Sequence, residues 1–357
     1  MFLSFIKEES ATPLLSFISI QKLGKDIEQV KSPPTVKGKD EDLILQNIRR
    51  SVEKNNLNNI TRTNAYLSFY KEYPEIHWSF LAHMVSRNAG YHMTDIQSVF
   101  FKSILKDNDI KSLFYFLEKA NFEIFADAYP QLLLYQESKK RGLPLFHLLD
   151  VLNISPFMKV LWNEFWRTQD SRMLTVAMII NEQQLLQQRV LNHNNSFSSL
   201  QSMLFTFHDR LALTTILFPF YKKNKKKRSL TGAAVHHFEE VNQRITTGKK
   251  LYQLLFHSDI YAHAFSFAQQ INHTGSREDY WPETYHAEIQ NNRVHSPPLA
   301  AVWTDVKNTL ACPEEWYDSR KKLLPLHSLP IISPRDLSSL HTKKIKWIKR
   351  LQKSILL

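Results

Sequence analysis

The chain has 357 residues, of which 43% are hydrophobic, so it can bury a substantial core. Seven glycines argue against a fold rich in tight turns and against a glycine-lined phosphate loop, and a single cysteine, Cys312, excludes an intrachain disulfide framework. The formal net charge of +12 is too concentrated along the chain to indicate a protein that is basic over its whole surface.

Residues 1–40 have weak periodicity and end in a stretch that contains Pro33, Pro34 and Gly38, which predicts a flexible N-terminal arm. The apolar N-terminal stretch lacks the basic region followed by an uninterrupted apolar run that a secretory signal peptide has. No stretch reaches about 18 consecutive apolar residues, so no transmembrane helix is predicted. The first helix of the folded part is expected near residues 41–56.

The stretch from Asn59 to Asp95 carries two helical patterns, which Pro74 divides. The second pattern covers residues 75–89, and Gly90 is expected to end it. On a helical wheel this segment is apolar on two opposite sides, which is typical of a buried helix. Its polar residues would then lie in the interior, and the first of the two helices adds Arg62; the polar residues are Glu75, His77, Ser79, His83, Ser86, Arg87 and Asn88.

Two interpretations of these buried polar groups stay open. Each would cost about 1–3 kcal/mol if it remained unpaired, so each must meet a partner, water or a ligand. Most buried polar groups belong to hydrogen-bonded networks that fix helix packing, and this interpretation is favoured. The alternative is a pocket in which arginines bind an anion and His83 acts as acid or base; its candidates are Arg62, Glu75, His83, Arg87 and Asn88.

Several motifs resemble the bacterial YppC-like family. They include Thr61-Arg62-Thr63, His77-Trp78, residues 82–90, residues 127–131, Asn181-Glu182-Gln183, residues 273–277 and residues 279–282. The resemblance covers roughly residues 40–310. Because the family is catalogued as a domain of unknown function, it implies a bacterial, cytoplasmic protein but no activity, cofactor or catalytic residue.

The segment from Thr94 to Gly142 is predicted to contain several helices. Thr94 and Gln97 have capping-box spacing and are expected to open one helix, a second follows near residues 110–117, and Pro130 is expected to restart a helix that ends before Gly142. Asp127 and Gln131 flank that proline. They are interpreted as capping and loop groups, with the lining of a cleft as the alternative.

Ser155-Pro156 predicts the start of another helix. In the helix after it, the apolar face from Met173 to Ile180 continues into glutamines 183, 184 and 187. This polar patch is interpreted as the point where the helix emerges into water, with a second edge of the cleft as the alternative.

Residues 192–200 predict a loop, the short apolar stretch 211–221 suits a buried helix, and the pattern from Val235 to Ile245 continues as a helix. His236 and Glu240 share a helical face, yet the HExxH arrangement is absent. A solvated surface is therefore favoured there, and neither a metal site nor a cofactor is predicted.

Gly275-Ser276-Arg277 lies in a predicted loop, where anion contact or turn formation is expected. No GxSxG motif supports Ser276 as a nucleophile. The secondary candidates for a binding site are Asp127, Gln131, Asn181, Glu182, Ser276 and Arg277.

Pro297-Pro298 is expected to open a last folded helix through Val306, residues 312–339 form a proline-rich extended segment, and residues 340–357 form a basic amphipathic tail helix. Two acid-free runs carry twelve basic residues, which equal the whole net charge; they are Lys222, Lys223, Lys225, Lys226, Lys227 and Arg228 in a loop and Lys343, Lys344, Lys346, Lys349, Arg350 and Lys353 in the tail.

We therefore predict an all-α, bundle-like fold with little or no β structure, in which residues 41–311 form one helical domain. The favoured function is a binding or scaffold protein whose basic loop and tail engage an anionic membrane surface or nucleic acid, in the cytoplasm or at the membrane periphery. Alternatively, both runs only solubilise the protein, or the tail docks on its own body. The second function is an enzyme or sensor that binds a small phosphate or carboxylate compound in the candidate pocket, although no motif identifies a reaction.

Overall fold

The computed structural model describes residues 11–30, 38–192, 215–221, 228–234, 238–289, 293–311 and 314–356. Helices dominate these ranges, which confirms the predicted all-α class. The α-helices are α1 (Phe17–Gln29), α2 (Lys39–Asn55), α3 (Asn59–Glu72), α4 (His77–Asp95), α5 (Val99–Ile104), α6 (Asp107–Arg141), α7 (Pro156–Thr168), α8 (Ser171–Leu186), α10 (Val241–Leu255), α11 (Tyr261–Gln270), α12 (Leu299–Val302) and α13 (Ser338–Leu356).

Shorter elements connect the helices. The 3₁₀ segments are η1 (Phe146–Leu152), η4 (Arg277–Asp279) and η5 (Arg320–His327), and η2 (Gln187–Leu191) is a π-helical turn. The strands are β1 (Ala11–Pro13), β2 (Thr215–Phe220), β3 (Ser229–Ala234), β4 (Tyr285–His286), β5 (Val294–His295) and β6 (Ser328–Pro330). They form three two-stranded sheets, of which β1–β6 and β2–β3 are antiparallel and β4–β5 is parallel.

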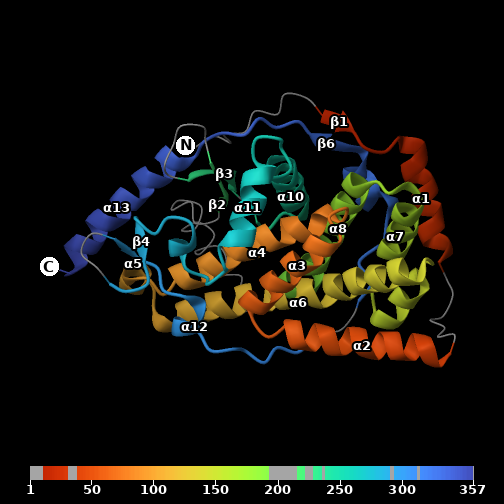
Figure 1. Ribbon diagram of the computed structural model, residues 1–357, viewed down its shortest axis with the longest axis horizontal. Coiled ribbons are helices and arrows are strands. Elements are labelled where there is room, and N and C mark those ends of the chain that lie inside the picture. The colour runs from red at the N-terminus through yellow and green to blue at the C-terminus, as the bar shows by residue number, and fades with distance from the viewer. Residues whose placement is uncertain are drawn as a thin grey trace.

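The 35-residue helix α6 runs lengthwise through the molecule, with α3, α4 and α8 packed along it. Helices α1 and α7 lie at one end, whereas α5, β4 and α13 lie at the other (Figure 1). In the described ranges, no helix combines the length and the apolar character that crossing a membrane requires.

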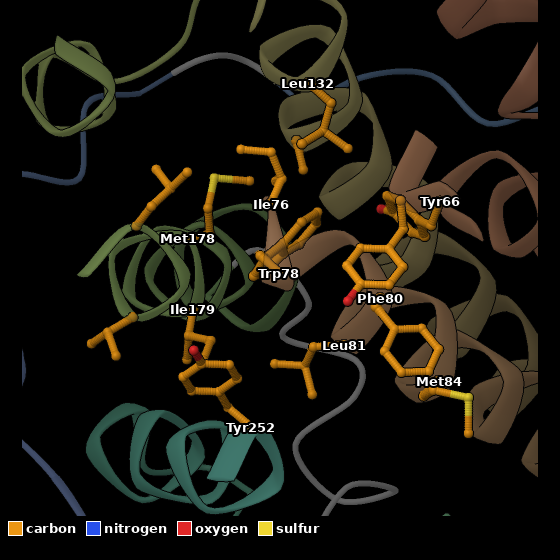
Figure 2. Packing of buried hydrophobic residues seen from close by; sticks show 14 of the residues in the cluster. Tyr66, Ile76, Trp78, Phe80, Leu81, Met84, Leu132, Met178, Ile179 and Tyr252 are labelled. Atoms are coloured by element: carbon orange, nitrogen blue, oxygen red, sulfur yellow. The ribbon is translucent and has the colours of Figure 1, made fainter. Parts of the chain in front are cut away.

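Helix α4 is apolar on two sides and buried on both, as predicted. Trp78 and Phe80 are both buried in the main core, although they lie on different faces of the helix. Figure 2 shows Ile179 of α8, Leu81 of α4 and Tyr252 of α10 turned toward one another. Polar residues between these apolar positions are therefore drawn into the interior with the helix.

Three predicted helix boundaries are wrong. Helix α4 continues through Gly90 to Asp95, and Ser98 rather than Thr94 precedes α5. At position 90 a Cβ atom would lie 2.3 Å from Asn59 Oδ1, so this glycine permits a close contact instead of ending a helix. Pro130 is buried inside α6 rather than at a restart, and the tertiary packing around it outweighs its local tendency to break a helix.

The apolar stretch near residue 215 forms strand β2 instead of the expected helix. Its run of β-branched and aromatic residues pairs with β3, with Thr215 opposite Ala234. The helical pattern expected from Val235 begins only at Val241, and Val235 itself lies outside the described residues. A short apolar run does not distinguish a buried strand from a buried helix by periodicity.

The expected flexible arm contains folded structure over residues 11–30. Strand β1 pairs with β6, and α1 buries Ile20, Leu23 and Ile27 in the main core. Ser16 caps α1 by accepting a hydrogen bond from the Ser19 amide at 3.1 Å. A capping serine followed by apolar residues at helical spacing predicts a helix. Because residues 1–40 taken together have only weak periodicity, this signal did not lead to a predicted helix.

At the other end, α12 is one turn long, and the chain is extended from Trp303, whose ring stacks on Phe114 at 3.9 Å. The helix predicted through Val306 is thus shorter than expected. Residues 314–337 include η5 and β6, and the tail forms the predicted helix α13. The division into domains stays a prediction.

Candidate functional site

The polar side chains of α3 and α4 are buried, but they do not converge on one pocket. Arg62, His83 and Arg87 are each 1% exposed. Successive positions of a helix point in different directions, and each of these side chains meets a partner from a different element.

Arg62 forms a buried ion pair with α6. Its Nη2 donates to Glu118 Oε2 at 2.5 Å, and its Nη1 donates to Asn56 Oδ1 at 3.1 Å. Burial raises the pKa of the Glu118 carboxyl, against the charge of Arg62. The partner carboxylate is essential here, because a buried charge without a counter-ion is costly.

Arg87 connects α4 to the loop after α11 through hydrogen bonds and an ion pair. Its Nη1 donates to the Ile271 carbonyl at 2.7 Å, and Nη2 lies 3.3 Å from Asp279 Oδ2. His273 Nε2 lies 2.8 Å from Asn59 Oδ1, and because that oxygen can only accept, we assign the proton to Nε2. Burial lowers the pKa of His273 to about 4, so the ring is neutral at pH 7.

His83 and Asn88 each hydrogen-bond to the main chain of a neighbouring element. His83 Nδ1 donates to the Thr63 carbonyl at 2.8 Å, and burial lowers its pKa well below the usual value. Asn88 pairs with the edge of β2 that faces away from β3, since its Nδ2 donates to the Leu217 carbonyl at 3.0 Å and its Oδ1 accepts from the Leu217 amide at 2.9 Å. Glu75 accepts from the Tyr135 hydroxyl at 2.7 Å. The five candidates therefore contact different partners and do not line one common pocket.

Asp127, Gln131 and Asn181 do meet, in a closed network between α6 and α8. Asp127 Oδ2 accepts from Asn181 Nδ2 at 2.6 Å and from Gln131 Nε2 at 2.8 Å. The indoles of Trp162 and Trp316 donate to Gln131 and Asn181. Burial raises the pKa of Asp127 to about 6. Asp127 and Gln131 lie within a continuous helix, so their interpretation as capping and loop groups is wrong.

Ser276 and Arg277 shape a turn. Ser276 Oγ accepts from the Glu278 amide at 3.1 Å and caps η4. Arg277 binds both oxygens of Asp95, with Nε at 2.9 Å from each, and its Nη1 donates to the Tyr280 hydroxyl at 2.7 Å. The expected turn formation is present, and the arginine has an internal carboxylate as its anion.

A cavity of about 200 Å³ lies between α3, α4, α6, α8 and α10. We call it the interhelical cavity. Its walls are mainly apolar, and its polar lining residues are Arg62, Ser86, Asn121, Glu182, Gln183, Arg244 and Thr247. Of the eleven pocket and secondary candidates from the sequence, only Arg62 and Glu182 line it.

Glu182, Gln183 and Arg244 form a hydrogen-bonded group in this wall. Gln183 Nε2 donates to Glu182 Oε1 at 2.7 Å, and Arg244 Nε donates to Gln183 Oε1 at 2.9 Å. Burial raises the pKa of Glu182 to about 7 and lowers that of Arg244 to about 10. The glutamine patch of α8 therefore binds a buried arginine, and its interpretation as an exit to water is wrong.

Sequence reasoning missed Arg244. The available signal was its position, because Val241, Arg244, Gly248 and Leu251 follow one another at helical spacing. An arginine and a glycine interrupt what would otherwise be an apolar stripe. Gly248 also lines the cavity, and a Cβ atom there would lie 2.7 Å from Ile179 Cγ2.

The two basic runs are described only in part. Lys222, Lys223, Lys225, Lys226 and Lys227 lie outside the described residues, as does His236. Arg228 packs its guanidinium over the Phe267 ring at 5.2 Å and donates to the Asp279 carbonyl at 3.3 Å, so it has a structural role.

On α13, Ile345 is buried and the Trp347 ring lies 6.0 Å from that of Phe100. The tail thus docks on its own body, as one alternative anticipated, while Lys343, Lys346 and Arg350 remain exposed.

Comparison with known proteins identifies relatives without a described activity. A family model described as "Protein of unknown function (DUF2515)" matches residues 54–322. The uncharacterized protein YppC of Bacillus subtilis (strain 168) is 41% identical over 238 residues, which cover 66% of this chain and 72% of that protein. No solved structure matches the chain at a significant level. The resemblance predicted from the sequence is confirmed.

Proposed function

The chain belongs to the DUF2515 family, and because the description of that family assigns no activity, we propose a function from the geometry of the interhelical cavity. The protein is a ligand-binding protein that holds a small carboxylic acid with an apolar body. The observation that carries this proposal is the apolar cavity with a buried arginine in its wall.

The size of the cavity sets the size of the ligand. At about 200 Å³ it is somewhat larger than the engineered cavity of about 150 Å³ that binds benzene. The walls include Trp78, Leu81, Ile124, Ile179 and Leu251. A single aromatic ring or a short branched chain with one polar group matches this space.

The charges in the wall favour an anionic polar group. The charge of Arg62 is already balanced by Glu118, whereas Arg244 donates to the side chains of Gln183 and Gln187 and to the Phe238 carbonyl. A carboxylate would offset the unfavourable burial of the Arg244 guanidinium. Glu182, with its pKa near 7, opposes an anion little because it takes up a proton readily.

Three probes of matched shape test the proposal, namely phenylacetate, phenethylamine and ethylbenzene. Calorimetric titration is expected to show that phenylacetate binds most tightly to the wild type. Ala89→Leu, which places a larger side chain in the cavity wall, is expected to abolish binding, whereas Ala262→Leu on the exposed face of α11 preserves it. Equal binding of phenylacetate to both variants would show that the cavity is not its site.

A second function is favoured by the exposed basic face of α13, because Lys343, Lys346 and Arg350 face solvent while Ile345 fastens the helix to the body. We propose that this face associates with an anionic membrane surface, where each lysine contributes about 1 kcal/mol. Because the apolar stripe of α13 packs against the body of the protein, the association of α13 with the membrane is electrostatic and weakens as the salt concentration rises.

The Lys343→Gln/Lys346→Gln variant is expected to lose binding to vesicles that contain phosphatidylserine at low salt. Binding that the variant retains in full would refute the membrane role. Loss of binding to duplex DNA but not to vesicles would replace the membrane by nucleic acid as the partner.

A further inference from the structure

A second, smaller cavity lies where α13 packs against the body, near α5 and β5. Its volume is about 40 Å³, and we call it the tail cavity. Its polar lining includes Ser98, Arg277, His295, His341 and Lys344, together with Asp95. These residues come from four separate stretches of the chain, one of which is α13, so the tail helix completes this site.

The lining has more positive than negative charge. Asp95 is the one acid among the lining residues, and both of its oxygens accept hydrogen bonds from Arg277. Because Asp95 is already paired with Arg277, no lining carboxylate remains for the Lys344 ammonium. This ammonium is half-buried and has no hydrogen-bonding or ionic partner among the described residues. Burial alone lowers the pKa of Lys344, which is the behaviour of an ammonium without a compensating carboxylate.

One further polar atom around the cavity lacks a hydrogen-bond partner among the described residues. Nδ1 of His295 is buried and has no hydrogen-bond partner in the described part of the chain. Ser98 precedes α5, yet its hydroxyl makes no capping hydrogen bond to that helix. Buried polar groups are normally satisfied, so a group of such side chains around a cavity suggests an absent partner.

We propose that the tail cavity binds one small oxyanion, such as phosphate or sulfate, and that this ion links α13 to the body. A volume of about 40 Å³ exceeds the 10–15 Å³ or so that one water needs and suits a single tetrahedral ion. Lys344 supplies charge and donors, Ser98 supplies a hydroxyl donor, and His295 donates from Nδ1 once the anion favours its protonated form. The ion is a free one, because α13 covers the cavity; a lipid phosphate is the alternative source.

The experiment compares sodium sulfate, sodium phosphate and sodium chloride at equal ionic strength, by thermal unfolding and by calorimetric titration of the full chain. Sulfate and phosphate are expected to bind with saturation at one site and to raise the melting temperature, whereas chloride does not. Lys344→Gln is expected to weaken sulfate binding at least tenfold. The control Lys111→Gln, at an exposed position of α6, changes it less than twofold.

Several results would overturn the proposal. Sulfate stabilisation that rises linearly without saturation is a general salt effect and not a site. If Lys344→Gln and Lys111→Gln weaken sulfate binding equally, the ion responds to the overall surface charge and not to a site. If the protein binds vesicles that contain phosphatidate but binds neither free sulfate nor free phosphate, the ligand is a lipid phosphate and not a free ion. If Lys344→Gln does not fold, Ser98→Ala replaces it, and unchanged sulfate affinity in that variant counts against the site.

Discussion

At the scale of single residues, several buried or half-buried basic side chains fall into two groups. Arg62, Arg87 and Arg277 each reach a carboxylate within the fold, whereas Arg244 and Lys344 line cavities and form no ion pair that the described residues show. The sequence predicted that polar groups would enter the interior, because α4 is apolar on both sides. It did not predict the partners, since Arg62 and Glu118 are 56 positions apart and Arg87 and Asp279 are 192 apart.

Arg62→Met tests the structural role of the first group. The variant leaves Glu118 buried without a counter-charge, and we expect it to lower the free energy of unfolding by about 3–5 kcal/mol. The double variant Arg62→Met/Glu118→Met removes both charges and should recover most of that loss in urea unfolding. A double variant no more stable than Arg62→Met would contradict the assignment of this pair to packing.

Glu182→Gln tests the carboxyl in the cavity wall. The pKa of Glu182 is raised in the folded state to about 7, so its contribution to stability is present below about pH 4.5 and is lost as the pH rises through 7. We therefore expect the variant to gain about 1–3 kcal/mol relative to wild type between pH 4.5 and pH 8. Urea unfolding at both pH values measures this, with Glu53→Gln on the exposed face of α2 as the control. A relative stability independent of pH would contradict the raised pKa.

At the scale of elements, the helical segments were predictable from apolar periodicity, but several of their ends were not. Gly90 and Pro130 are local signals for a helix end, and tertiary contacts overrule both. The hairpin β2–β3 was missed because a short apolar run is ambiguous and because Asn88, which completes the edge of β2, lies far away in the sequence. Helix ends and strand edges are thus decided by partners that only the folded chain supplies.

The Gly90→Ala variant separates the local helix preference at position 90 from the tertiary contacts around it. Alanine is favoured over glycine inside a helix by about 1 kcal/mol, yet its Cβ would lie 2.6 Å from His273 Nε2 and closer still to Asn59 Oδ1. We expect a net loss of about 1–3 kcal/mol in the free energy of unfolding. Gly24→Ala in α1 is the matched control, because its new Cβ would meet only the flexible side chain of Arg320. A stabilised Gly90→Ala protein would mean that the contact with the His273 loop is not tight.

At the scale of the whole molecule, composition and periodicity were sufficient for the all-α class, since α3, α4, α6 and α8 each carry a face that can be buried only against another helix. They were not sufficient for the site. The interhelical cavity is the space that five packed helices leave, and small residues such as Ala89, Ala120 and Gly248 together line it. We propose that ligand binding belongs to this cavity and that the buried polar residues of α4 serve packing.

The affinity of phenylacetate, measured by calorimetry at pH 7 for wild type and two variants, tests this claim most directly. Arg244→Lys keeps a positive charge but loses the planar fork, and it should weaken binding about tenfold or more. His83→Gln alters the α4 seam outside the cavity and should leave the affinity unchanged within twofold. Weakened binding in His83→Gln together with unchanged binding in Arg244→Lys would contradict the claim.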